Sequence, residues 1–102
     1  MGNEKQTAET PLAFEELFKD IDLKDRAKAY VLIEAEPVEI PYILEELSKI
    51  KNVLSADVVT GIYDIIVFIE GEDQNEIGRI VIREINSIKG VKKATTCMVV
   101  RI

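Results

Sequence analysis

Two segments of this chain are apolar at nearly every position, and they constrain the fold more than any other feature. The first covers residues 29–35 (Ala-Tyr-Val-Leu-Ile-Glu-Ala) and the second covers residues 64–70 (Asp-Ile-Ile-Val-Phe-Ile-Glu). Both have the length of strands and are rich in β-branched and aromatic residues. Because successive side chains of a strand point to opposite faces, each segment predicts a strand that is covered on both faces.

Apolar residues at helical spacing follow each of these strands. One helix is predicted after Pro37, with Pro41 in its opening turn. The apolar face of this helix consists of Ile40, Ile43, Leu44, Leu47 and Ile50. A second helix is predicted after Asp73, which can act as its N-cap, and Gly90 closes it as a C-terminal cap would. The apolar face of this second helix consists of Ile77, Ile80, Val81, Ile85 and Ile88.

The remaining segments complete an alternating pattern. Residues 53–60 predict a second strand, residues 61–63 a hairpin turn into the third strand, and residues 91–102 a long last strand. The order strand, helix, strand, strand, helix, strand is that of the ferredoxin-like α+β fold. This fold is a four-stranded antiparallel sheet with two helices on one face.

Such a sheet leaves its second face bare, and here that face is apolar. Four strands give a footprint of roughly 20 by 19 Å, so roughly 400 Å² of apolar surface would face water. Covering it in a dimer is worth on the order of 20 kcal/mol, against association costs of about 4 to 15 kcal/mol. We therefore expect a homodimer, with the N-terminal segment folding over this face in a monomer as the alternative. The expected interface residues are Tyr30, Val31, Leu32, Ile33, Ile66 and Phe68.

Residues 1–26 are expected to form a polar tail and a short amphipathic helix, ahead of a domain at residues 27–102. Thr10 can cap this helix and Pro11 fits its first position. Its apolar face consists of Phe14, Leu17, Phe18 and Ile21.

Composition excludes several classes of function. A formal net charge of −6 and a pI of about 4.7 argue against direct nucleic-acid binding. The chain has no histidine, which removes the usual general base and the commonest transition-metal ligand, so we expect no enzyme activity, metal or cofactor. A single cysteine, no export signal and no apolar run of about 20 residues predict a cytoplasmic protein away from membranes.

Two motifs carry a resemblance to a known family. Gly61-Ile62-Tyr63-Asp64, followed by an apolar strand, resembles the hairpin turn of the effector-binding and oligomerisation (RAM) domain of the Lrp/AsnC transcriptional regulators. The ending Thr95-Thr96-Cys97-Met98-Val99-Val100 resembles that family's last strand. The likeness covers residues 27–102. Residues 1–26 are too few for the family's helix-turn-helix domain, so the resemblance implies a stand-alone effector domain.

By this resemblance, dimers would assemble into a higher ring-like oligomer and bind an amino acid at contacts between dimers. A turn around Gly61 can offer backbone N–H groups to the carboxylate of such an effector, and Asp64 can accept from its ammonium group. Ile62 and Cys97 stand where some relatives have polar residues, which favours an apolar effector or a degenerate site. The expected effector residues are Gly61, Ile62, Tyr63, Asp64, Thr95 and Cys97.

Other interpretations remain open at this point. Gly61 and Asp64 could serve the turn alone, since hairpins favour glycine and aspartate for conformational reasons. The protein would then be a structural oligomerisation partner of full-length Lrp/AsnC regulators, with a vestigial site. A cofactor-independent enzyme of the dimeric α+β barrel type is the third alternative, weakened by the lack of histidine and of a converging pair of buried polar residues.

Overall fold

The computed structural model describes residues 26–102, so the short helix expected ahead of the domain, with Phe14, Leu17, Phe18 and Ile21 on its apolar face, lies outside the described residues. The described chain alternates strands and helices as the sequence predicts. Its elements are β2 (Ala27–Ala35), η2 (Pro37–Glu39), α2 (Ile40–Ser48), β3 (Val53–Val58), β4 (Ile65–Gly71), α3 (Gln74–Ile80), η3 (Val81–Ile85) and β5 (Val91–Met98).

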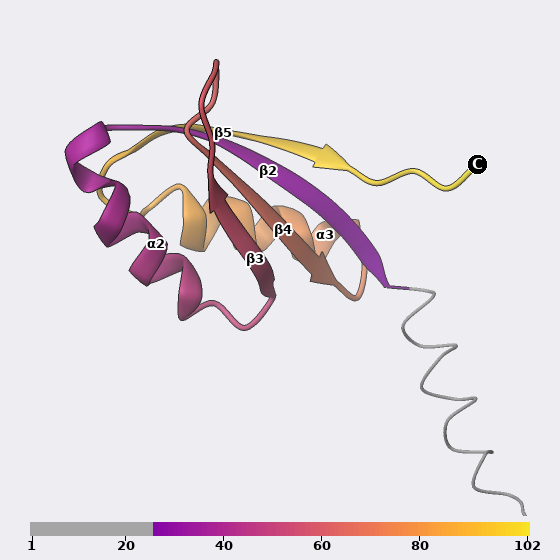
Figure 1. Cartoon of the computed structure of the whole chain (residues 1–102). Helices are drawn as coiled ribbons and strands as arrows, with labels where there is room; N and C mark the ends of the chain where they lie inside the picture. The colour runs from indigo at the N-terminus through magenta and orange to yellow at the C-terminus, as the bar shows by residue number, and fades with distance from the viewer. Residues whose placement is uncertain (1–25) are drawn as a thin grey trace, which may run out of the picture.

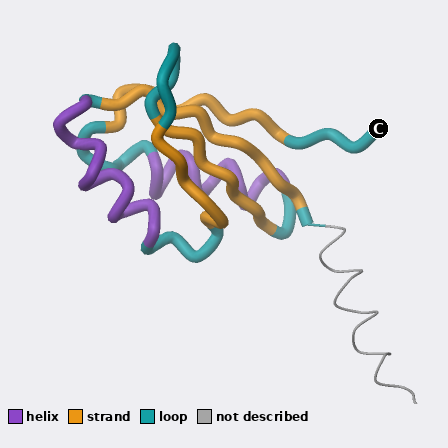
Figure 2. Tube along the Cα trace, in the orientation of Figure 1, coloured by secondary structure: helices purple, strands orange, loops and turns teal. Residues whose placement is uncertain are grey.

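The strands form one antiparallel sheet in the order β3-β4-β2-β5 (Figure 1). The two long apolar strands, β2 and β4, are therefore central neighbours, and β3 and β5 are the edges. Both helices lie on the same side of the sheet (Figure 2), which leaves the other side without cover from the described chain. This arrangement confirms the ferredoxin-like α+β fold.

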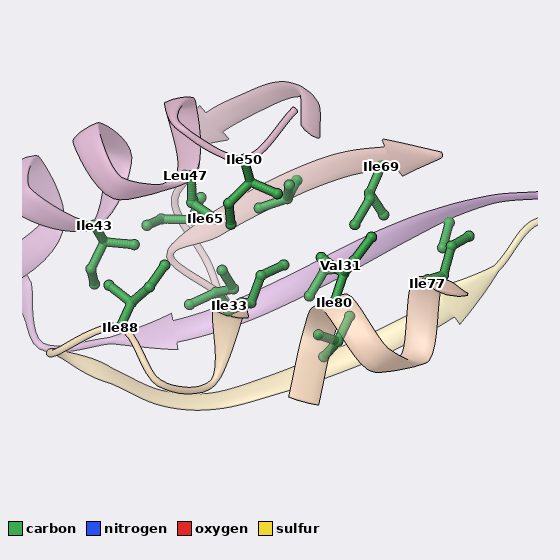
Figure 3. Close-up of a cluster of buried hydrophobic side chains, with 14 of the residues drawn as sticks. Val31, Ile33, Ile43, Leu47, Ile50, Ile65, Ile69, Ile77, Ile80 and Ile88 are labelled. Carbon is green, nitrogen blue, oxygen red and sulfur yellow. The ribbon is translucent and has the colours of Figure 1, made fainter. Parts of the chain in front are cut away.

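The core lies between the sheet and the helices, and β2 and β4 supply its sheet side. Val31, Ile33, Ile65 and Ile69 are fully buried there, against residues of both helices (Figure 3). Every buried residue of the described chain is apolar or glycine. The helix residues that complete this core are Ile43, Leu47, Ile77, Ile80, Val81 and Ile85.

The structure corrects the predicted end of the second helix. The helix does not run to Gly90: α3 passes into a π-helical turn, η3, which ends at Ile85. Ile88 still packs into the core from the turn that follows, so its helical spacing in the sequence was misleading. Gly90 adopts a φ of +100° immediately before β5, and its carbonyl accepts a hydrogen bond from the Glu36 N–H at 2.8 Å.

The two edge strands are shorter than expected. β3 ends at Val58 rather than at residue 60, because the chain turns away there toward the hairpin tip. β5 ends at Met98, although the Val99 N–H still donates to the Lys28 carbonyl at 2.9 Å. Beyond that bond, residues 99–102 have no strand assignment.

Candidate functional site

The open face of the sheet has an apolar centre. Tyr30 and Leu32 of β2 lie opposite Phe68 and Ile66 of β4 in the strand register. The rings of Tyr30 and Phe68 are tilted by 31° with their centroids 4.8 Å apart, a favourable aromatic contact. Tyr30 is 45% exposed, and the other three are half-buried. We call these four residues the apolar stripe.

Two of the six residues expected at the dimer interface lie elsewhere. Val31 and Ile33 are fully buried between the sheet and the helices, so the expectation that they take part in the interface is wrong. The physical reason is the alternation of the strand: the odd-numbered side chains of β2 face the helices and the even-numbered ones face away.

Charged residues flank the apolar stripe at both ends. At one end Lys28 of β2 lies opposite Glu70 of β4, and at the other Glu34 of β2 lies opposite Lys93 of β5. Edge strand β3 adds Asp57, which lies opposite Ile66. The open face therefore has a narrow apolar centre with charged borders, which is the composition of a protein interface with a polar rim.

The hairpin turn between β3 and β4 projects beyond the end of the sheet (Figure 1). Gly61 has a φ of +125°, a conformation that strongly favours glycine. A Cβ at this position would meet no atom within 4 Å, so the backbone conformation rather than crowding requires the glycine. Ile62 at the tip is 84% exposed, whereas Tyr63 is half-buried.

Asp64 fixes the base of this turn to the neighbouring strand. Its Oδ2 accepts a hydrogen bond from the Ala35 N–H at 2.8 Å, where the register between β2 and β5 shifts. Its backbone N–H donates to the Ile33 carbonyl, and its carbonyl accepts from the Val59 N–H, both at 2.8 Å. The carboxylate thus has a structural role, and its Oδ1 has no hydrogen-bond donor among the described residues.

The last strand places its two threonines on opposite faces. Thr95 pairs with Leu32 and shares the open face with the apolar stripe, while Thr96 pairs with Val31 and faces the helices. Cys97 pairs with Tyr30 and is also on the open face, as an exposed free thiol.

A single chain does not bring the hairpin turn together with Thr95 and Cys97. Asp64 lies at the start of β4, and β2 separates β4 from β5. Two strand spacings amount to roughly 10 Å, and Cys97 lies further along the sheet as well. Side chains of this size do not bridge that distance, so the expected effector residues form two separate groups on one chain.

Two hollows in the described surface lie away from these residues, and the sequence analysis missed both. One, of about 370 Å³, lies between α2 and β3 and is lined by Leu44, Ser48, Val53, Leu54, Ser55 and Ala56. The other, of about 260 Å³, is lined by Lys51, Asn52, Glu76, Arg79, Ile80, Arg83 and Glu84. The residues of the second come from segments far apart in the sequence, so no local motif indicates it.

The described residues contain no group of three or more acidic, histidine or cysteine side chains arranged to hold a metal ion. Neither described helix has the length and hydrophobicity of a membrane-spanning segment.

Comparison with known proteins identifies the domain. Residues 28–102 match the family model of the Lrp/AsnC ligand-binding domain. An uncharacterized HTH-type transcriptional regulator from Pyrococcus horikoshii is 31% identical over 68 residues, which are 67% of this chain and 43% of that protein. The chain therefore spans less than half the length of this curated relative.

Solved structures agree on the fold. E. coli AsnC superimposes with a TM-score of 0.73 at 18% identity, over 97% of this chain and 61% of that one. A transcriptional regulator from Neisseria meningitidis, solved as a complex with L-methionine, has a TM-score of 0.66 at 19% identity, over 96% of this chain and 59% of that one. The protein therefore belongs to the Lrp/AsnC family, and residues 28–102 are its ligand-binding domain.

Proposed function

We propose that this domain binds an amino acid between copies of the chain and that binding changes how the copies assemble. The observation that carries the proposal is the separation of the hairpin turn from Thr95 within one chain. Both lie at the open side of the sheet, but only a second copy could bring a turn against a last strand. An amino acid that contacts two copies at once binds the assembled state more tightly than the separate copies, so binding favours assembly.

The apolar stripe supports a homodimer as the first step of assembly. Tyr30, Leu32, Ile66 and Phe68 leave apolar surface uncovered in the described chain, and their charged borders match the rim of an interface. A higher ring-like oligomer built from such dimers would place the projecting hairpin turns near neighbouring dimers.

The residues favour an effector with an apolar side chain. Ile62 is exposed at the tip of the turn, and Cys97 is exposed on the last strand, so a pocket formed by both would have apolar walls. The family relative from Neisseria meningitidis binds L-methionine, an amino acid of this kind. In this proposal the Asp64 Oδ1, which has no donor among the described residues, accepts from the ammonium group.

The test combines native mass spectrometry with a variant that separates the two roles of Asp64. Asp64→Asn keeps an oxygen to accept from the Ala35 N–H but removes the charge that would attract an ammonium group. Amino acids at millimolar concentration should shift the oligomer distribution of the wild type and not that of Asp64→Asn. A normal response by this variant would show that the site assignment is wrong.

A second function is favoured by one observation. Because the Asp64 carboxylate already anchors the turn to Ala35, the residue has a structural reason to be present without any effector. The domain would then act as an oligomerisation partner of full-length Lrp/AsnC regulators, with a vestigial site. Calorimetry with all twenty amino acids separates the two proposals. If no amino acid gives a heat of binding and the oligomer is stable, the structural proposal is favoured.

A further inference from the structure

The hollow on the helix side of the domain gathers positive charge in an acidic protein. Lys51 enters it from the turn between α2 and β3, Arg79 from α3 and Arg83 from η3. Glu76 and Glu84 line the same hollow, so its lining has one positive charge in excess, whereas the chain as a whole has a net charge of −6. The hollow is therefore locally positive on a protein whose net charge is negative.

These three cations form no ion pair with another described residue. By contrast, Arg26, Lys49, Lys89 and Lys92 each lie within 4.0 Å of a carboxylate oxygen. Lys28, Lys93 and Arg101 also form no ion pair with a described residue, so what distinguishes the three cations is that they line one hollow together. An anion entering it would meet guanidinium and ammonium groups whose hydrogen bonds are not already committed to described acids.

One of the two carboxylates is engaged elsewhere. The Glu76 Oε1 accepts a hydrogen bond from the Glu72 N–H at 2.6 Å, and the Glu76 N–H donates to Oδ1 of the N-cap Asp73 at 2.8 Å. Asp73 thus caps the first turn of α3, and the Glu76 side chain bonds the residue that precedes this N-cap. Glu76 keeps its negative charge in this arrangement, so both carboxylates oppose an incoming anion, and Glu84 is the one without a part in capping α3.

Two hydrogen bonds hold the backbone on one side of the hollow, and a π-helical turn forms the other side. The Asn52 Nδ2 donates to the Glu70 carbonyl at 2.9 Å, and the Glu70 N–H donates to the Asn52 carbonyl, which ties the loop that carries Lys51 to the end of β4. On the other side, the Asn86 N–H donates to the Val81 carbonyl five residues earlier, in the π-helical turn that carries Arg83. Such turns are rare and occur frequently at functional sites.

We propose that this hollow binds a small phosphate-class anion, held by Arg79, Arg83 and Lys51. Two guanidinium groups can donate paired hydrogen bonds to tetrahedral oxygens, and an ammonium group adds a point charge. The volume of about 260 Å³ accommodates inorganic phosphate or the phosphate group of a monoester, and is small for a larger organic ligand. This site is separate from the proposed effector site at the hairpin turn.

The experiment titrates the full chain, labelled with nitrogen-15, with inorganic phosphate at constant ionic strength set by sodium chloride. We expect saturable shifts of the backbone amides of Asn52, Arg79 and Arg83. Adenosine monophosphate forms a second arm: shifts at the same amides with tighter binding indicate a phosphate group carried on an organic molecule, and weaker binding indicates free phosphate. Shifts that stay linear, or that saturate only elsewhere in the chain, would overturn the proposal.

Variants of exposed residues test the assignment. Arg79→Gln and Arg83→Gln should each weaken binding about tenfold, the loss expected for one charge-assisted contact. Glu84→Gln should tighten binding several-fold, because it removes one of the two opposing carboxylates. Lys92→Gln, which removes a cation on β5 that pairs with Glu36, is the matched control and should leave the affinity unchanged. Equal affinity of the wild type and both arginine variants would refute the site.

Discussion

The two faces of this sheet are built from the same strands and differ in what covers them. On the helix side, the residues of β2 and β4 are buried, apart from the partly buried Ala27 at the start of β2, and none is charged. On the open side, the same strands present four half-buried or exposed apolar residues with Lys28, Glu34 and Glu70 at their ends. A face that folds against its own chain tolerates no charge, whereas a face that meets another molecule keeps charges at its borders.

Ile33→Ala should have the largest effect, because it leaves a cavity on the covered face. Ile33 is fully buried, so we expect the free energy of unfolding to fall by about 2 to 5 kcal/mol in urea titrations followed by circular dichroism. Leu32→Ala is the matched control, since it removes a similar side chain from the opposite face. It should destabilise the domain less. An equal loss for both variants at all protein concentrations would contradict the difference between the faces.

Phe68→Glu should break the open face without unfolding the domain. A carboxylate in the apolar stripe loses its hydration when a partner covers it, so the dissociation constant of the dimer should rise at least about a hundredfold, near 3 kcal/mol. Analytical ultracentrifugation should show a folded particle of 11.5 kDa.

The control for this variant places the same charge on the helix side. Ile82 is exposed on η3, and Ile82→Glu should leave the oligomer unchanged. If Phe68→Glu assembled as the wild type does, the open face would not be the dimer interface.

Two glycines with positive φ differ in their surroundings: atoms crowd the position of a Cβ at Gly90, and none lies within 4 Å of one at Gly61. Gly90→Ala should cost about 1 to 3 kcal/mol of unfolding free energy, because its Cβ would overlap the Glu39 Cβ in addition to the backbone strain. Gly61→Ala carries the backbone strain alone, since nothing lies within 4 Å, and should cost roughly 1 kcal/mol. Thermal denaturation of both variants measures the difference, and an equal loss would contradict the role of packing at Gly90.

The sequence predicted the order of the elements because each apolar segment has a clear period. It did not assign the faces correctly, since both alternating sets of β2 are apolar and periodicity alone does not say which set meets the helices. A usable signal was present: one set contains Lys28 and Glu34, and the other contains no charge. Val31 and Ile33 would have been assigned to the core by that signal.

Two further features were beyond local patterns. The spacing of Ile85 and Ile88 fits a continuing helix, and only tertiary packing decides that a π-helical turn ends it at Ile85. The cationic hollow joins Lys51 to Arg79 and Arg83 across a strand hairpin, so its residues become neighbours only in the fold. The candidate effector residues were found through a family motif, but the motif did not reveal that Asp64 is bonded to Ala35.

The smallest expected effect lies on the solvent side of the helices, away from both faces of the sheet. There the Lys49 Nζ donates a hydrogen bond to the Glu46 carboxylate at 2.9 Å. This bond and the ion pair raise the pKa of Lys49 above the ordinary value of 10.5. A pKa raised by folding means that the pair contributes stability below pH 10.5 and loses it as the pH rises through the higher folded value. Glu46→Gln should return the pKa of Lys49 toward 10.5 in an NMR titration of its side chain, with almost no change in thermal stability, because exposed pairs contribute little. A large loss of stability in this variant would mean that the outer surface of the helices contributes more to the fold than the contrast between the two sheet faces implies.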